Sequence, residues 1–194
     1  MPGRADISGD VGYLGMCSGS LTFLDLSGRK PRVTGDVAGL ATLTLLTSMD
    51  LQGTGVTGDV GSLAPLTQLT VLRLGDTYLS GDVASLASLT QLTSLRLSHT
   101  DHAGFTGVTG DVGSLASLTQ LTDLWLDTGQ VGNTGVSGNV KGLAPLTNLR
   151  YVELEGTGVY GDDSDVAQLL PLPLTNLRLG NTLVSSSSNA FEGR

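Results

Sequence analysis

The feature that most constrains this chain is a short segment that recurs at a fixed spacing. The tripeptide Gly-Asp-Val begins at Gly35, Gly58 and Gly81, so these copies are 23 residues apart. Another copy begins at Gly110 after an insertion, and related segments occur as Gly9-Asp10-Val11, Gly138-Asn139-Val140 and Gly161-Asp162. A period of this length is typical of a chain built from stacked structural repeats rather than from one conventional globular core.

One full unit, residues 80–97, reads SGDVASLASLTQLTSLRL and contains two periodicities. Its leucines at 86, 89, 92 and 95 are three residues apart, which is the period of a 3₁₀-helix. The step from Leu95 to Leu97 has the two-residue period of a strand. We therefore expect each unit to contain a strand, a turn, an extended Gly-Asp-Val segment and a 3₁₀-like return, which together form one coil of a solenoid. Such a coil is stable only when stacked on its neighbours.

The segment Leu72–Val83, LRLGDTYLSGDV, resembles the plant-type leucine-rich-repeat pattern LxLxxNxLxGxIP. Thr77 stands where that family usually has asparagine, Val83 where it has isoleucine, and the proline is absent. The resemblance extends over residues 7–184. It implies a β-rich α/β solenoid, a right-handed superhelix with a parallel sheet on its concave face and 3₁₀ or extended segments on its convex face. Members of this family usually recognise proteins.

The repeats predict the organisation of the whole chain. We expect an N-terminal capping repeat over residues 1–33, five repeats over 34–159, an irregular C-terminal repeat over 160–184 and a flexible tail over 185–194. Cys17 is expected as a buried residue of the first cap. Insertions near 100–105 and 129–133 follow strands of adjacent repeats, and they would form either a recognition rim or tolerant, neutrally drifting loops.

The residues between the leucines of each strand should point away from the core, and they differ from repeat to repeat. Trp125 is the only tryptophan, and we expect Tyr151 diagonally across from it on the next strand. Because tryptophan, tyrosine and arginine are enriched at interface hot spots, we expect this face to bind a partner. The alternative is a merely solvated face with a local contact between Arg96 and Trp125. The predicted partner-binding residues are Arg73, Arg96, Asp123, Trp125, Asp127, Tyr151 and Glu153, with His99 and Phe105 on the adjoining rim.

Charge and composition narrow the function further. The formal net charge of −8 opposes binding to nucleic acids and to anionic membranes, and it favours a partner with a basic surface. The chain has one cysteine, no basic-then-apolar signal peptide pattern and no Asn-x-Ser/Thr sequence, which favours a cytoplasmic or otherwise intracellular location. His99 and His102 could reach a metal only with Asp101, so we expect no metal, no cofactor and no catalytic residues. The expected molecule is a monomeric, non-enzymatic scaffold for protein–protein interaction.

Two regular columns support alternative functions. The aspartates Asp36, Asp59, Asp82 and Asp111 could bind calcium, or each carboxylate could accept backbone amide hydrogens in its own turn. The threonine rows could order water or ice or adhere to a surface, although they lie on a return segment rather than on a flat strand array. These rows are Thr67, Thr90, Thr119 and Thr147, and Thr70, Thr93 and Thr122.

Overall fold

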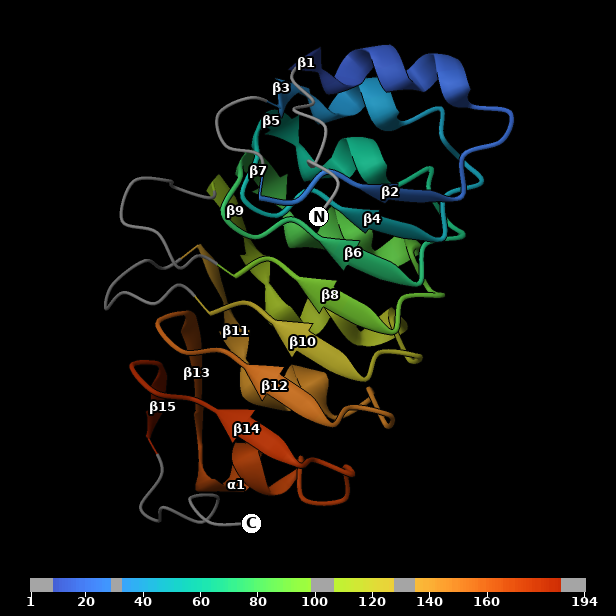
Figure 1. Ribbon diagram of the computed structural model, residues 1–194. Coiled ribbons are helices and arrows are strands. Elements are labelled where there is room, and N and C mark those ends of the chain that lie inside the picture. Colours follow the sequence, from blue (N-terminus) through green and yellow to red (C-terminus); the bar gives the residue numbers. More distant parts are fainter. Residues whose placement is uncertain (1–8, 29–32, 99–106, 128–134, 186–194) are drawn as a thin grey trace, which may run out of the picture.

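The computed structural model describes residues 9–28, 33–98, 107–127 and 135–185, and within them the chain forms a stack of coils (Figure 1). One parallel sheet contains seven short strands whose spatial order follows the order of the chain. Its middle residues are in register, so that Met49 pairs with Leu72, and Leu72 with Leu95. The expected parallel sheet is therefore confirmed. The strands are β2 (Phe23–Asp25), β4 (Ser48–Asp50), β6 (Val71–Arg73), β8 (Ser94–Arg96), β10 (Asp123–Trp125), β12 (Tyr151–Glu153) and β14 (Asn176–Arg178).

The extended Gly-Asp segments pair with one another in a second parallel sheet, which the sequence analysis did not identify. Pairing satisfies their backbone N–H and C=O groups, which single extended segments would leave to solvent. The register of this sheet is displaced, because Asp36 pairs with Thr57 and not with the equivalent Asp59. Its eight strands are β1 (Gly9–Asp10), β3 (Val33–Asp36), β5 (Gly55–Asp59), β7 (Tyr78–Asp82), β9 (Gly107–Asp111), β11 (Val136–Asn139), β13 (Gly158–Asp162) and β15 (Leu183–Ser185). Ser185, which begins the expected tail, is thus the last residue of a strand.

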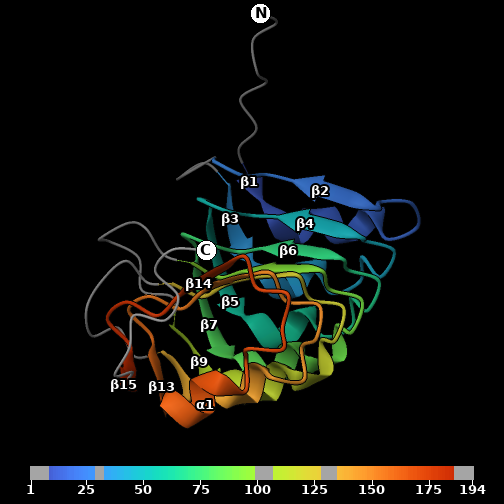
Figure 2. The ribbon, with the colours of Figure 1, turned by 90° about the horizontal axis from the view of Figure 1, so that it is seen from below.

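Short 3₁₀ segments return the chain from the second sheet toward the first, as the three-residue leucine period predicts. Viewed along the stack, the two sheets and these segments lie on three sides of each coil (Figure 2). The last coil instead contains a short α-helix, α1 (Asp163–Ala167), which begins with a capping box between Asp162 and Asp165. The 3₁₀ segments are η1 (Val11–Cys17), η2 (Val37–Leu40), η3 (Val60–Leu63), η4 (Val83–Ser88), η5 (Val112–Ser117) and η6 (Val140–Leu143).

The Gly-Asp pair recurs because each aspartate fills a space that the next glycine leaves open. The Oδ1 atom of Asp59 accepts a hydrogen bond from the backbone N–H of Gly61 at 2.7 Å and so caps η3. The next coil places Gly81 against this carboxylate, where an added Cβ would lie 2.3 Å from Oδ1. Gly81 also has a φ of +112°, which side chains disfavour. A column of aspartates therefore serves as caps, and Asn139 serves in the same way for η6.

Leucine and valine side chains from both sheets and the 3₁₀ segments form a continuous core. Interior positions such as Leu72, Leu95 and Leu124 have no exposed surface. Thr54, Thr77 and Thr157 are also buried, and each hydroxyl donates to the backbone carbonyl three residues earlier, at 2.6–2.7 Å. These bonds satisfy the polar group that the core encloses.

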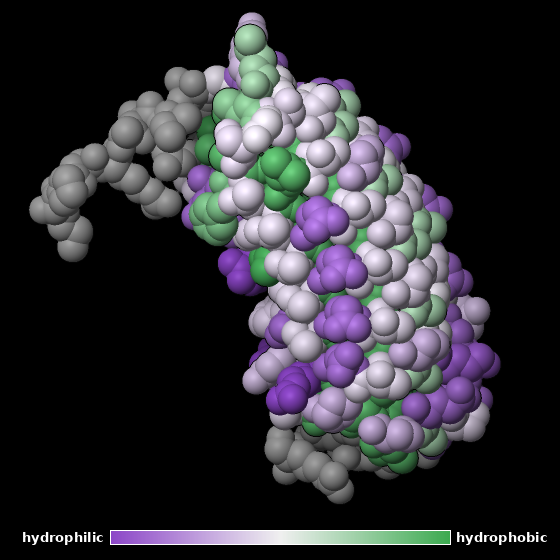
Figure 3. All heavy atoms as spheres, turned by 90° about the vertical axis from the view of Figure 1, so that its right-hand side faces the viewer, coloured by the Kyte–Doolittle hydropathy of each residue, from purple (hydrophilic) through white to green (hydrophobic). Residues whose placement is uncertain are grey.

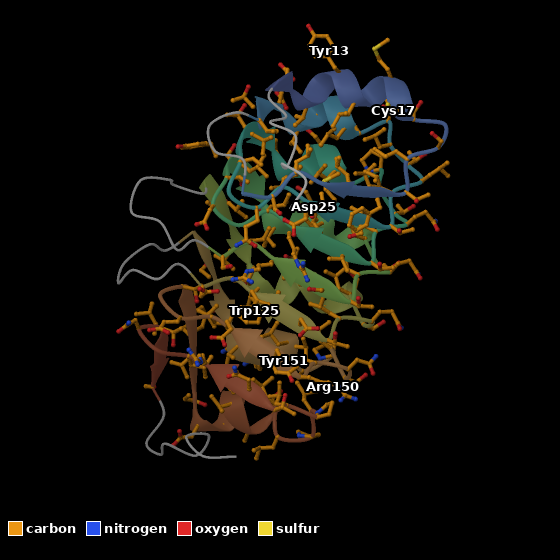
Figure 4. All side chains as sticks on the ribbon, in the orientation of Figure 1. Tyr13, Cys17, Asp25, Trp125, Arg150 and Tyr151 are labelled. Atoms are coloured by element: carbon orange, nitrogen blue, oxygen red, sulfur yellow. The ribbon has the colours of Figure 1, made fainter. Side chains whose placement is uncertain are left out.

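The two ends of the stack differ in how well they are closed. At the N-terminal end Val11 is 1% exposed, although Tyr13 and Met16 on η1 are largely exposed. At the C-terminal end Leu183 is 69% exposed, and even Leu177 and Leu179 are only partly buried. The expectation that Cys17 is buried is wrong: it is exposed on η1, where a terminal coil has a neighbour on one side only (Figure 4). Among the described helices, none is long and apolar enough to span a bilayer.

One threonine row is occupied by contacts between coils. The hydroxyls of Thr70, Thr93 and Thr122 each donate to the backbone carbonyl of the equivalent threonine one coil earlier, at 2.9–3.0 Å. On the same side of the stack, Figure 3 shows a column of hydrophilic side chains, and the exposed residues at this turn include Gln68, Gln91, Gln120 and Asn148. This side therefore presents amides between threonines rather than a continuous threonine array.

Candidate recognition surface

Alternation along each strand of the first sheet separates core residues from outward-facing ones. In β10 the side chain of Leu124 is fully buried, whereas Asp123 and Trp125 on either side of it are partly exposed. The same alternation in the neighbouring strands creates an outer surface, which we call the strand face. It consists of the first and third residue of each strand and the second residue after the strand, because the residue directly after most strands is a buried leucine. Figure 4 shows Trp125 and Tyr151 on this face.

The third residues form a row across the strand face in which the arginines contact their neighbours. The register places Arg96 between Arg73 and Trp125, with Glu153 beyond Trp125. The guanidinium carbon of Arg96 lies 4.7 Å from the centroid of the Trp125 ring, which is a cation–π distance. Its Nε atom donates to Ser98 Oγ at 2.8 Å, so two contacts fix this side chain.

Two other neighbouring pairs in this row are ion pairs. Arg73 Nη1 lies 3.5 Å from Asp50 Oδ2, and Arg178 Nε lies 3.4 Å from Glu153 Oε1. Arg73 is largely exposed, so its pair with Asp50 is screened by solvent and contributes little to stability. All three arginines of the row, Arg73, Arg96 and Arg178, therefore contact other side chains of the same chain.

The first residues of the strands place Tyr151 beside Asp123, and therefore diagonally across from Trp125, as predicted. Tyr151 is 41% exposed. The Asp123 carboxylate lies 2.5 Å from the Thr122 hydroxyl and shares the single hydrogen of that hydroxyl with the Thr93 carbonyl. The strand face consequently has two aromatic side chains on adjacent strands, β10 and β12, in the C-terminal half of the sheet.

Asp127 follows β10 at the edge of the aromatic pair. Its Oδ1 atom is buried and has no hydrogen-bond partner among the described residues. Burial raises the pKa of this carboxyl group above its ordinary value, partly offset by a backbone hydrogen bond and by the charge of Arg96. The charges of Glu155 and Asp76 raise the same pKa further. The folded structure therefore disfavours the ionised form of Asp127.

Glu153 is also buried, with 6% of its surface exposed. Burial raises its pKa, Arg178 and a hydrogen bond from Asn176 Nδ2 at 2.9 Å lower it, and the charges of Asp127 and Glu155 raise it. We call Asp127, Glu153 and Glu155 the carboxylate cluster. The charge of Glu155 thus raises the pKa of both Asp127 and Glu153, although Asp127 comes from the coil before.

The structure brings together seven of the nine residues predicted for this surface. Arg73, Arg96, Trp125 and Glu153 share one row, Asp123 and Tyr151 share the next, and Asp127 lies beyond β10. His99 and Phe105 lie outside the described residues, as do His102 and Asp101. Sequence reasoning missed Asn176 and Ser98 as supporting residues and Asp76 as a neighbouring charge. The repeat pattern indicates that these three residues face outward or lie in turns. Only the three-dimensional structure shows which side chains they approach.

The described residues contain no group of three or more histidine, cysteine, aspartate or glutamate side chains arranged to hold a metal ion. The carboxylates of the aspartate column instead accept backbone amide hydrogens, as for Asp36 and Ala38 at 2.8 Å and Asp82 and Ala84 at 2.8 Å.

Two parallel sheets of short strands, joined by 3₁₀ segments around a leucine core, define a leucine-rich-repeat solenoid. No family model matches the sequence, and no curated protein matches it as a relative. Solved structures of plant receptor ectodomains do share the fold. The PEPR1-AtPEP1 complex has 25% sequence identity and a TM-score of 0.72, and it covers 91% of this chain. The ectodomain of the Arabidopsis thaliana receptor kinase GASSHO1/SCHENGEN3, in complex with CASPARIAN STRIP INTEGRITY FACTOR 2, has 20% identity and a TM-score of 0.67 over 89% of this chain.

The fold also occurs in bacterial proteins. Internalin C2 from Listeria monocytogenes has 26% identity, a TM-score of 0.53 and coverage of 80% of this chain and 67% of its own. By contrast, this chain spans only 24% of the PEPR1 chain and 22% of the GASSHO1/SCHENGEN3 chain. The comparison with plant ectodomains therefore concerns a short section of a long solenoid.

Proposed function

We propose that this chain is a non-enzymatic binding module that holds a protein or peptide partner on its strand face. The observation that carries this proposal is the position of Trp125. The only tryptophan of the chain lies on the outside of the sheet, half-buried beneath Arg96 and near the exposed ring of Tyr151. Large aromatic side chains on a surface are common anchors of an interface.

The contrast between the two sides of the same strands supports the proposal. Inward positions are almost all leucine or a similar aliphatic residue, because the core fixes their size. Outward positions change from strand to strand, from Arg96 to Trp125 to Glu153, although each occupies the same place in its coil. A scaffold with constant packing and a variable outer surface is suited to recognising a particular partner.

The related folds are consistent with this function. The structure of the Arabidopsis receptor kinase HAESA contains a peptide hormone, IDA, and the co-receptor SERK1. At 19% identity this similarity concerns the fold, so the choice of face for the present chain depends on its own residues.

Selection of peptides from a random 12-residue display library on the immobilised full chain tests the proposal. Clones that bind the wild-type chain are then measured against a double variant, Arg96→Ala with Trp125→Ala. We expect binding to fall at least tenfold, because truncating central interface residues commonly costs about 2 kcal/mol or more each.

Tyr160→Ala is the matched control, because Tyr160 is an exposed aromatic residue on β13 of the other sheet. This variant should bind the selected clones as the wild-type chain does, and all variants should melt as single folded species. Clones that bind the double variant as tightly as the wild type would place the binding surface elsewhere.

A further inference from the structure

The strand face has a strong local imbalance of charge between β10 and β14. Asp123, Asp127, Glu153 and Glu155 contribute carboxylates there, whereas the arginines in or next to this region are Arg178 on β14, Arg96 on the neighbouring β8 and Arg150, which is exposed just before β12. Arg178 contacts Glu153, and Arg96 contacts Trp125 and Ser98. Arg96 and Arg178 are thus already engaged, and four carboxylates against three arginines leave a net negative surface beside the aromatic pair.

Asp127 is the clearest sign that this surface is incomplete without a partner. A buried carboxylate oxygen normally has a hydrogen-bond donor, and leaving it without one costs the full desolvation penalty. Asp127 Oδ1 has no such donor among the described residues. A cation arriving from outside would supply the missing donor and add to the positive charge of Arg96.

The neighbouring aromatic rings select the kind of cation. Lysine and arginine side chains bury their aliphatic stems on apolar surfaces and keep their charged heads at a polar edge. Trp125 offers such a surface beside Glu153 of the carboxylate cluster, and Tyr151 extends it on the side of Asp123. A metal ion fits less well, since the described carboxylates do not converge as a set of three ligands.

We propose that the strand face selects a partner segment that carries an arginine or lysine, with its aliphatic stem against Trp125 and Tyr151 and its charged head at Asp127, Glu153 and Glu155. This inference rests on the proposed function and adds the chemistry of the partner. Electrostatic steering by the cluster would also speed association at low ionic strength.

The experiment repeats the peptide selection on two variants that carry the same net charge. The first variant, Asp127→Asn with Glu155→Gln, neutralises two carboxylates of the cluster and leaves the Glu153–Arg178 ion pair in place. The second, Asp59→Asn with Asp82→Asn, neutralises two carboxylates of the second sheet. The control should fold normally, because Asn139 already caps η6 through its side-chain oxygen. Thermal melts of both variants confirm the folded state before selection.

We expect peptides selected on the wild-type chain and on the Asp59/Asp82 variant to be enriched in arginine and lysine, and those selected on the Asp127/Glu155 variant not to be. A synthetic copy of a selected peptide with citrulline in place of arginine, or with acetyl-lysine in place of lysine, should bind the wild-type chain about tenfold more weakly, as expected for loss of a charge-assisted hydrogen bond. It should lose little further affinity for the Asp127/Glu155 variant.

Each outcome separates this inference from the proposed function. Peptides that require Trp125 and Arg96 but show no basic enrichment would overturn the inference and leave the proposed function standing. If basic peptides bind the Asp127/Glu155 variant as tightly as the wild-type chain, the proposed contact of the charged head with the carboxylate cluster is wrong. If no selected peptide depends on Trp125, both proposals fail.

Discussion

A single carboxylate, Asp127, shows how stability and recognition can conflict at one residue. Burial raises its pKa, so the folded protein retains this proton to a higher pH than the unfolded chain. Protonated Asp127 therefore favours the folded state at low pH, and this contribution to the free energy of unfolding is lost as the pH rises through the raised pKa. Near neutral pH the ionised group therefore destabilises the fold.

We expect Asp127→Asn to melt at a higher temperature than the wild-type chain at pH 7, because asparagine removes the buried charge and keeps the shape. The difference should shrink as the pH falls toward the ordinary value of 3.8. Thermal unfolding of both proteins, monitored by circular dichroism between pH 7 and pH 3.8, measures this difference in melting temperature. An equal or lower melting temperature for the variant at pH 7 would indicate that the ionised carboxylate has a favourable partner, contrary to our interpretation. Stability gained at the expense of binding is a common sign of a functional residue.

Gly81 shows a second constraint at the scale of a residue. Its positive φ and the Asp59 carboxylate leave no room for a side chain. We expect Gly81→Ala to lower the free energy of unfolding by about 1–3 kcal/mol, the typical cost of a strained backbone conformation. Gly19→Ala is the control, since an added Cβ there meets no atom within 4 Å. Urea denaturation of both variants makes the comparison, and equal stabilities would contradict the proposed fit between coils.

At the scale of an element, α1 replaces a 3₁₀ segment in the last coil and depends on ionised groups. Asp165 accepts from Asn139 Nδ2 at 2.8 Å and lies 3.1 Å from Lys141 Nζ. The hydrogen bond from Asn139, followed by contacts with Lys141 and Asp162, lowers the pKa of Asp165. The pKa of Asp162 is also lowered, by hydrogen bonds from Ser164 and Asp165.

A lowered pKa stabilises the folded state above the ordinary pKa, and this contribution is lost as the pH falls through the folded value. We therefore expect α1 to open in acid before the interior 3₁₀ segments do. Amide hydrogen exchange of Asp163–Ala167 and of η4, each corrected for its intrinsic rate, measures this as the pH is lowered. Asn139→Ala should weaken the pH dependence at α1, and unchanged behaviour would show that the contact between coils does not support the helix.

The elements were predictable from sequence to different extents. The leucine periods predict the strands of the first sheet and the 3₁₀ returns, because the side chains that face the core must recur with the backbone geometry. The second sheet was not predicted, because its Gly-Asp segments have few apolar residues and its pairing depends on a displaced register between coils. Trp125 could be placed outward from its position between leucines. The missing donor at Asp127 could not be foreseen, because it depends on groups from other coils.

At the scale of the whole molecule, the stack is closed unevenly. Core leucines of the interior coils, such as Leu72 and Leu95, have no exposed surface. The first coil exposes Tyr13 and Met16 on η1 but buries Val11 and most of Leu24, whereas in the last coil the leucines of both strands remain partly or largely exposed. In a repeat protein each coil is stabilised by its immediate neighbours. The coil with the least buried apolar surface should therefore open most often.

We expect amide hydrogen exchange to be fastest in β14 and β15, slower in β2 and slowest in β6, β8 and β10. Mass spectrometry of peptides from exchanged protein resolves these segments. Leu183→Ser should leave the rates in β6 and β8 unchanged, because Leu183 is already 69% exposed. Uniform exchange along the stack would indicate that the chain opens as a single cooperative unit instead.

The fit of an aspartate into the space beside the glycine of the next coil makes the interior coils structurally equivalent to one another. Each interior coil presents an aspartate to the coil that follows and a glycine to the coil before. The gain or loss of one complete interior coil would therefore preserve the packing between the coils that remain. Shorter insertions have no such match and must be accommodated in the turns, where the sequence does carry them. The cross-section of this protein is therefore fixed by its chemistry, while its length is free to vary in evolution.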